Sequence, residues 1–208
     1  MTKYAMAVDM KRCMGCNMCS MSCRVEHNLP NGVVYNRAIT EGGEGFRVAG
    51  GAYPDTLTMK FYTLSCQHCD NPGCVSVCPT GATYKREEDG LVLVNAENCI
   101  GCGSCIAGCP YEGVRTLLPG EPEYPLEFAL GDAAVPEHVG NTVEKCTFCV
   151  ERLDRGEKPL CVALCPAYAR YFGDLDDPES EISKVLAERE CEQLLVDQGT
   201  GPQAYYLV

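Results

Sequence analysis

The sequence predicts an α+β fold made of two nested cysteine-rich units, with extended loops and a C-terminal helix and tail. Of the 17 cysteines among 208 residues, all except Cys191 fall into four groups of four. The first and third groups share one sequence motif, and the second and fourth groups share another. Because the second and third groups lie close together in the chain, they should form one unit, with the first and fourth groups paired around it.

Two internal repeats define this order. YAMAVDMKRCMGCNMCSMSC (4–23) aligns without a gap with GLVLVNAENCIGCGSCIAGC (90–109), a short strand followed by a cysteine motif. GCVSVCPTGATY (73–84) resembles LCVALCPAYARY (160–171) through a shared C-V-x2-C-P. The two kinds of motif therefore alternate along the chain.

The spacing of the third group indicates its chemistry. Cys99, Cys102, Cys105 and Cys109 stand at C-x2-C-x2-C-x3-C before a proline, the run that binds a [4Fe–4S] cube in bacterial ferredoxins. Three thiolates on one tight loop reach three irons, and the fourth cysteine binds the other cluster of a pair. The first group has the same spacing, with Arg24 in place of the proline. We therefore expect two ferredoxin-like units with two [4Fe–4S] clusters each.

Two other uses of cysteine fit this pattern less well. A secreted disulfide scaffold does not need cysteines in four quartets, and no signal peptide precedes them. Structural zinc favours two separated C-x2-C pairs, whereas Cys13, Cys16 and Cys19 place three sulfurs in one loop. Four iron–sulfur clusters are the better interpretation.

The crossing of the fourth cysteine predicts the ligands of each cluster. The predicted sets are Cys13, Cys16, Cys19 and Cys165 for cluster A; Cys146, Cys149, Cys161 and Cys23 for cluster B; Cys66, Cys69, Cys74 and Cys109 for cluster C; and Cys99, Cys102, Cys105 and Cys78 for cluster D. The sequence contains no Ser–His–Asp arrangement, no carboxylate pair in an apolar setting and no nucleotide loop. We predict no catalytic residue, so the chain should transfer electrons without bond chemistry of its own.

The four groups divide the chain into segments. Residues 1–55 and 140–175 should form the outer unit with clusters A and B, and residues 56–118 the inserted unit with clusters C and D. Residues 119–139 should form a connector, and 176–208 a C-terminal helix and tail that dock on a partner.

Local patterns predict the other elements. Residues 4–8 should form a strand with Tyr4, Met6 and Val8 on one face. The insertion at 24–65, with its glycine-rich centre, should be a surface hairpin and loop. The further predicted elements are a strand in 56–65, a helix in 180–196 and a strand in 204–208.

The charge of the chain excludes one class of partner. The formal net charge is −12, and each cluster, a core of about +2 held by four thiolates, adds about −2. So acidic a protein is not expected to bind nucleic acid. No run of eighteen apolar residues occurs, so we expect no direct membrane span. The first residues show neither an apolar signal region nor twin arginines, and we expect no export signal on this chain.

Several single residues have two interpretations. His68 could donate a hydrogen bond to a cluster sulfur or be a packed or solvent-facing neighbour of the cluster. His27 and His138 are interpreted as surface residues, and Cys191 as a half-buried thiol in the C-terminal helix. Five cations could either offset cluster charge or be solvated: Lys85, Arg86, Lys145, Arg152 and Arg155.

Four quartets in this order resemble the iron–sulfur (beta) subunit of the dimethyl-sulfoxide-reductase superfamily of molybdopterin oxidoreductases. The resemblance includes CQHCDNPGCVSVCPTGA, CIGCGSCIAGCPY, KCTFCVERLDRG and GDLDDPESEISKVL. The last two segments and the GTGP tail are most similar to beta subunits of respiratory arsenate and polysulfide reductases.

This resemblance implies a large catalytic partner with a molybdopterin (bis-MGD) site and, in part of the family, a quinone-binding membrane subunit. Electrons would pass through clusters A to D, with A toward the catalytic subunit and D toward the membrane or another external partner. The implied location is peripheral, on the outer face of the membrane through co-export with the catalytic subunit. A cytoplasmic complex is the alternative location.

A free-standing polyferredoxin shuttle is the alternative function. The long connectors at 24–65 and 110–145 favour a subunit of a complex, because a free shuttle needs little surface beyond its cubes.

Overall fold

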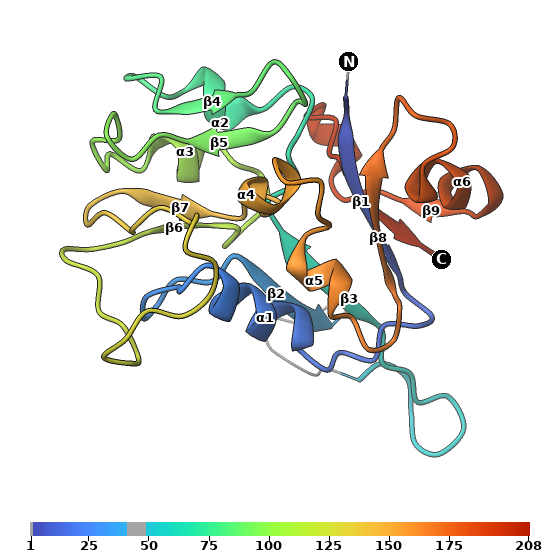
Figure 1. Ribbon diagram of the computed structural model, residues 1–208. Coiled ribbons are helices and arrows are strands. Elements are labelled where there is room, and N and C mark those ends of the chain that lie inside the picture. Colours follow the sequence, from blue (N-terminus) through green and yellow to red (C-terminus); the bar gives the residue numbers. More distant parts are fainter. Residues whose placement is uncertain (1, 41–48) are drawn as a thin grey trace.

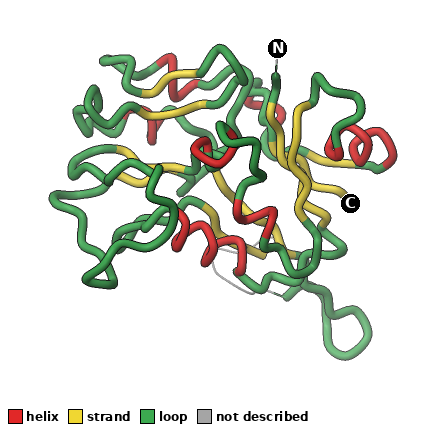
Figure 2. The backbone as a smooth tube through the Cα atoms, in the orientation of Figure 1, coloured by secondary structure: helices red, strands yellow, loops and turns green. Residues whose placement is uncertain are grey.

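The computed structural model describes residues 2–40 and 49–208 of the chain. It shows a mixed α and β fold with short helices around one four-stranded sheet and three two-stranded hairpins (Figure 1). Loops and turns connect nearly all of these elements, as Figure 2 shows. The fold class expected from the sequence is therefore correct at the level of a mixed fold with few helices.

The four-stranded sheet joins the two ends of the chain. Its strand order is β8–β1–β10–β9, in which β1 is antiparallel to β8 and parallel to β10. The bounds are Tyr4–Asp9 for β1, Arg170–Asp174 for β8, Cys191–Glu192 for β9 and Ala204–Leu207 for β10. The predicted terminal strand is thus present as β10, and it pairs with the first strand.

Three antiparallel hairpins follow the cysteine groups. They pair β2 (Asn36–Thr40) with β3 (Phe61–Ser65), β4 (Thr83–Lys85) with β5 (Val92–Val94), and β6 (Arg115–Leu117) with β7 (Val143–Lys145). The β2–β3 hairpin agrees with the expectation for the insertion, whose residues 41–48 lie outside the described part. The strand predicted in 56–65 is confined to its second half.

The helices are short because the cysteine motifs leave little room for them. Their bounds are Met18–Glu26 for α1, Gly73–Ser76 for α2, Ser104–Ala107 for α3, Val150–Leu153 for α4, Leu160–Ala163 for α5, Glu181–Glu188 for α6 and Val196–Gln198 for the 3₁₀ helix η1. Helix α1 packs against α5, and α2 against α3, on opposite sides of α4 (Figure 1). Within the described ranges, no helix is long and apolar enough to cross a membrane.

Cysteines form a large part of the main core. Met6, Leu29, Leu91 and Phe148 pack there against the buried thiols of both motif types. A second core lies on the other face of β1, where Ala5 and Ala7 contact α6 and β10. Strand β1 is therefore buried on both faces: Tyr4 and Met6 share the face of the main core, as expected, and α6 covers the side of Ala5 and Ala7.

The C-terminal helix is shorter than predicted. Ser180 caps α6 by accepting a hydrogen bond from the Ser183 amide at 3.2 Å. The helix ends at Arg189, which is extended and binds the Asp9 carboxylate. Cys191 then lies exposed on the edge strand β9 instead of half-buried in a helix.

Candidate iron–sulfur sites

The first and third cysteine groups fold into loops with left-handed residues at matched positions. Gly15 and Asn17 have φ values of 65° and 62°, and the matched Gly101 and Gly103 have 66° and 72°. Glycine adopts this region freely and asparagine tolerates it. Asn17 and Gly103 are also the N-cap residues of α1 and α3. The chain direction therefore reverses within each loop. The loop then enters a helix whose second residue is the third cysteine of the group, Cys19 in α1 and Cys105 in α3.

The second and fourth groups share another local geometry. Pro72 and Pro159 stand at the N-caps of the one-turn helices α2 and α5. His68 and Phe148 occupy the same position of each C-x2-C loop, with φ values of 44° and 58°. Their rings stack with centroids 3.9 Å apart. This stack joins the second and fourth groups at the centre of the molecule.

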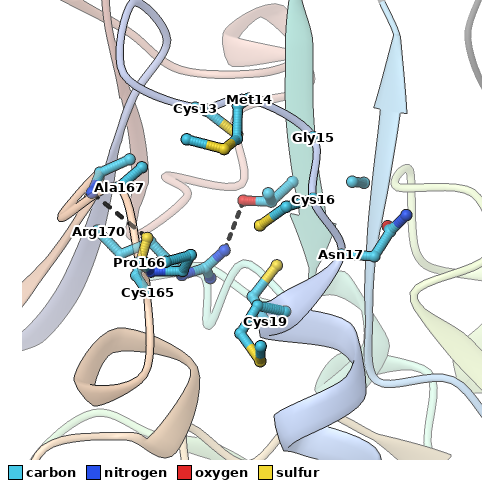
Figure 3. Close-up of a pocket in the computed structure, with 14 residues that line it drawn as sticks. Cys13, Met14, Gly15, Cys16, Asn17, Cys19, Cys165, Pro166, Ala167 and Arg170 are labelled. Carbon is cyan, nitrogen blue, oxygen red and sulfur yellow. Dashed lines mark hydrogen bonds between the residues drawn. The ribbon is translucent and has the colours of Figure 1, made fainter.

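The four thiols predicted for cluster A line one pocket (Figure 3). Cys13, Cys16 and Cys19 come from the first loop and the start of α1, and Cys165 follows α5. The side chain of Arg170 lines the same pocket. The fold thus brings together three thiols of the first group and the last thiol of the fourth.

The four thiols predicted for cluster B are buried together. Cys23, Cys146, Cys149 and Cys161 are all classed among the buried residues. Burial raises the pKa of Cys23 well above its ordinary value, and the other three thiols raise it further. Thiols in such surroundings become thiolates readily only beside a positive partner, and iron supplies one.

The thiols predicted for cluster C also lie near one another. Burial raises the pKa of Cys69 to about 11, although a hydrogen bond with Thr200 acts against it. The thiols of Cys66, Cys74 and Cys109 add to the rise. The structure therefore brings the second group together with the last thiol of the third.

The thiols predicted for cluster D reach the surface, as those of cluster A do. Cys105 is buried, Cys78 and Cys99 are half-buried, and Cys102 is exposed. A hydrogen bond with Ser104 lowers the pKa of Cys102, while the thiol of Cys78 acts to raise it. Cys78 and Cys102 are therefore within electrostatic reach of each other across the α2–α3 pair.

Backbone amides donate hydrogen bonds to some of these sulfurs. The Thr83 amide lies 3.3 Å from Cys78 Sγ, and the Ala169 amide 3.4 Å from Cys165 Sγ. Burial acts to raise the pKa of Cys78, but the bonds from Thr83 and Thr80 lower it to about 7. Such bonds favour the thiolate that iron requires.

The residues present fit [4Fe–4S] clusters. The chemistry of the donor set is that of four thiols per site. Among the described residues, Arg115 Nε, Arg115 Nη1 and Arg170 Nε are buried without a hydrogen-bond partner. Unpaired buried donors are costly, and the anionic sulfurs of a cluster would satisfy them. Within the same residues, no three Cys, His, Asp or Glu side chains converge on a single metal ion. A cube differs from such a site because its thiolates bind separate irons.

Two histidines lie inside the protein, which corrects their assignment to the surface. His27 is 2% exposed, and its Nε2 lies 3.3 Å from Cys149 Sγ. His138 is half-buried; its Nε2 donates to the His27 carbonyl oxygen at 2.8 Å, and its Nδ1 lies 3.0 Å from a Glu144 oxygen. Helix α1 carries His27 inward because it continues past the cysteine motif.

His68 is packed inside the protein, and both of its ring nitrogens hydrogen-bond to backbone groups. Its Nδ1 accepts a hydrogen bond from the Val92 amide at 3.1 Å, and its Nε2 donates to the Cys146 carbonyl oxygen at 3.1 Å. Both ring nitrogens are therefore occupied by backbone groups. Of the two interpretations of this residue, packing agrees with the geometry.

The cations near the cysteines fall into two kinds. Four of the five that flank the motifs pair with carboxylates: Lys85, Arg86, Arg152 and Arg155. Lys145 is instead buried, as are Arg115 and Arg170, which the sequence motifs did not single out. The internal repeat relates one of these cations to a second buried position: Arg170 aligns with Thr83, and both side chains are buried.

Comparisons with known proteins identify the family of the chain. The family model of the 4Fe-4S dicluster domain matches residues 57–117 and 132–175. An iron–sulfur subunit of Halobacterium salinarum, provisionally named as that of a dimethyl sulfoxide reductase, is 45% identical over 100% of this chain and 79% of its own length.

Two further relatives cover nearly the whole chain. The arsenate respiratory reductase iron–sulfur subunit of a Shewanella species is 36% identical over 99% of this chain and 96% of its own. A polysulfide reductase chain of Wolinella succinogenes is 38% identical over 98% of this chain and 93% of its own. The protein therefore carries [4Fe–4S] clusters and belongs to the family of iron–sulfur electron-transfer subunits of the dimethyl-sulfoxide-reductase superfamily.

Proposed function

We propose that this chain holds four [4Fe–4S] clusters through the thiol sets A to D. Electrons would pass through them between a molybdopterin (bis-MGD) catalytic subunit and a quinone-binding membrane subunit or another external redox partner. The observation that carries the proposal is the continuity of the four sets. Cys19 of set A adds to the effect of burial in raising the pKa of Cys161 in set B. Cys66 of set C does the same for Cys146 of set B.

Sets C and D are also contiguous. Cys74 of set C and Cys105 of set D pack in one apolar cluster with Val92 and Val143. Each set therefore has a neighbour in the order A, B, C, D. This order supports a linear path from one end of the protein to the other.

The two ends of this path reach the surface. Cys16 of set A is exposed, and the exposed side chains of Met14 and Met18 lie beside it in the loop. Cys102 of set D is exposed next to Ile100, which is 65% exposed. Apolar side chains around each end are suited to docking. We propose that set A faces the catalytic subunit and set D faces the membrane subunit or another external partner.

The nested organisation belongs to the same proposal. The outer unit would comprise residues 1–55 and 140–175, and the inserted unit residues 56–118. The contacts of α1 with α5 and of α2 with α3 support this division. Residues 119–139 would form the connector. The exposed side of 176–208, whose inner side packs against β1, would dock on a partner.

The names of the relatives support a catalytic partner, because each is one subunit or chain of a reductase. We propose a peripheral protein that is held at the membrane through its partners, on the outer face if the catalytic subunit is exported and in the cytoplasm otherwise. The substrate would be determined by the catalytic partner.

Purification of the native complex through this chain tests the proposal. We expect about sixteen irons per chain, four for each cluster, together with a large molybdenum-containing subunit. Low-temperature EPR after reduction should show interacting clusters. About sixteen irons on the isolated chain would favour the polyferredoxin shuttle, and about eight would contradict the four-cluster arrangement.

A further inference from the structure

Three buried cations lie at the junctions between neighbouring thiol sets. Arg170 begins β8, Arg115 begins β6 and Lys145 ends β7, and they are 6%, 4% and 3% exposed. Among the described residues, none of the three forms an ion pair with a carboxylate. A buried charge is costly unless it has a partner. Something other than a carboxylate must therefore compensate these cations.

Arg170 lies between sets A and B. Its side chain lines the pocket of the set A thiols, as Figure 3 shows, and its Nη1 donates to Thr63 Oγ1 at 2.8 Å. Burial disfavours its charged form. The thiols of Cys161 in set B and Cys19 in set A nevertheless hold the pKa of Arg170 above its ordinary value. The guanidinium therefore faces both sets.

Arg115 occupies the same kind of place between sets C and D. Its Nη2 donates to Cys74 Sγ of set C at 2.9 Å. Burial acts against its charge, but the thiols of Cys66, Cys74 and Cys105 raise its pKa. Cys105 belongs to set D, so this guanidinium also faces two sets. Its remaining nitrogens, Nε and Nη1, have no partner within the described residues.

Lys145 lies between sets B and C. Its ammonium group donates to the carbonyl oxygens of Val92 and, at 2.9 Å, Cys146. Val92 packs in one apolar cluster with Cys74 of set C, so the ammonium group lies between Cys146 of set B and set C. All three junctions of the path therefore contain one buried cation.

The charge of a cluster explains what such a cation does. A core of about +2 with four thiolates carries about −2, and reduction adds one more negative charge. A fixed positive charge beside the cluster stabilises the reduced form more than the oxidised form, so it raises the reduction potential. A cation between two clusters acts on both of them and so raises the potentials of both.

We propose that Arg170, Lys145 and Arg115 are junction cations, each of which raises the reduction potentials of the clusters on its two sides. This inference rests on the four-cluster arrangement proposed above. The two arginines are the sharper test because a guanidinium stays charged at any working pH. They place a fixed positive charge beside the clusters and make no bond to iron.

The test is a redox titration, followed by EPR, of the iron-loaded full chain with Arg170→Gln or Arg115→Gln. For Arg170→Gln we expect the equilibrium constant for reduction of clusters A and B to fall at least tenfold, which is about 59 mV for one electron. Clusters C and D should move much less. Arg115→Gln should give the converse pattern. The matched control is Arg155→Gln, which removes an arginine that pairs with Asp132 at the surface and should move no cluster.

The conservative variants Arg170→Lys and Arg115→Lys separate charge from shape. They should keep the iron content and recover most of each potential. The inference is overturned if the Gln variants move all clusters equally, if they move none, or if the Lys variants shift the potentials as far as the Gln variants do. If a Gln variant does not retain iron, retention by the Lys variant supports the role of charge, and equal loss from both overturns it. Iron content of the unmodified chain tests the four clusters separately from these outcomes.

Discussion

The first and third cysteine groups have the same spacing but continue differently after their last cysteine. Helix α1 has nine residues and runs beyond that cysteine, whereas α3 has four and ends before it. Arg24 follows the cysteine in the first group, and Pro110 follows it in the third. Proline disfavours the helical conformation of the preceding residue, while arginine is a good helix former. The residue after the last cysteine therefore contributes to the different helix lengths, together with Gly108, the C-cap of α3, which stands where α1 has Ser22.

The additional turn of α1 supports two other parts of the protein. Glu26 binds Arg152 of α4 at 3.0 Å, and its carbonyl oxygen accepts a hydrogen bond from the Asp132 amide at 3.0 Å. The His27 carbonyl oxygen accepts from His138 at 2.8 Å. The connector 119–139 therefore packs on the end of α1. The comparison shows that the last cysteine of the first group, Cys23, is buried under the longer helix and its contacts, whereas Cys109 of the third group is half-buried.

Replacing Arg24 with proline should remove this difference, and it has the largest expected effect. Arg24→Pro eliminates a helix hydrogen bond and introduces a clash with the preceding turn, at a cost of about 3 kcal/mol. The connector contacts of Glu26 and His27 should be lost with the last turn. The measurement is denaturant-induced unfolding of the iron-loaded chain.

Arg24→Ala is the control, because it removes the side-chain contacts with Asn31 and Val33 but keeps the helix. It should cost less than about 1 kcal/mol, as expected for a partly exposed side chain. Equal destabilisation by both variants would show that the side chain of Arg24, rather than the helix, carries the contribution.

The sequence predicted much of this comparison but not its consequences. Local patterns predicted the strand β1, the β2–β3 hairpin in the insertion and the terminal strand. The length of α1 also depends on a local residue, Arg24, so the burial of His27 was open to the same reasoning. The polarity of its sequence neighbours led instead to a surface assignment.

Other features depended on long-range packing that no local pattern contains. The covering of β1 by α6 brings residues about 175 positions apart together, and the pairing of Arg189 with Asp9 ends α6 early. The buried positions of Arg115 and Arg170 follow from where β6 and β8 pass between the thiol sets. The ligand sets stay a prediction until iron is assigned to them.

Glycine substitutions compare the two loops directly and should have an intermediate effect. A Cβ on Gly101 would lie 2.3 Å from the Asn141 carbonyl oxygen, and one on Gly15 would lie 2.3 Å from the ring of Phe61. A side chain can move more easily than backbone. We expect Gly101→Ala to lower the unfolding free energy more than Gly15→Ala does. Both losses of unfolding free energy should exceed the roughly 1–2 kcal/mol that the left-handed conformation alone costs.

Gly103→Ala is the matched control for these two variants. Gly103 has a similar φ of 72°, and nothing lies within 4 Å of a Cβ placed on it. It should therefore show the conformational cost alone. Thermal unfolding and iron content of the three variants measure the order, and a Gly103→Ala effect as large as that of Gly101→Ala would contradict the steric explanation.

The contact between the connector and α1 should depend weakly on pH, which is the smallest of the expected effects. Burial opposes a charge on His138, but its hydrogen bond with Glu144 raises the pKa of His138 above the ordinary value. The other groups that face the ring are His27, Tyr35 and Tyr124. Because the folded pKa is raised, the stabilisation is fully present below about pH 6.5 and is lost as the pH rises through the folded value.

His138→Gln should therefore destabilise the iron-loaded protein by about 1.5 kcal/mol near pH 6, the lower end of the range for a hydrogen bond to a charged group, and by less near pH 9. Glu137→Gln changes the charge of an exposed neighbour and should show no such trend. The difference in unfolding free energy between each variant and the unmodified protein is measured at both pH values. A His138→Gln effect that grows with pH would mean that the ring is neutral in the folded protein. The end of α1 would then hold the connector through the His27 carbonyl oxygen alone.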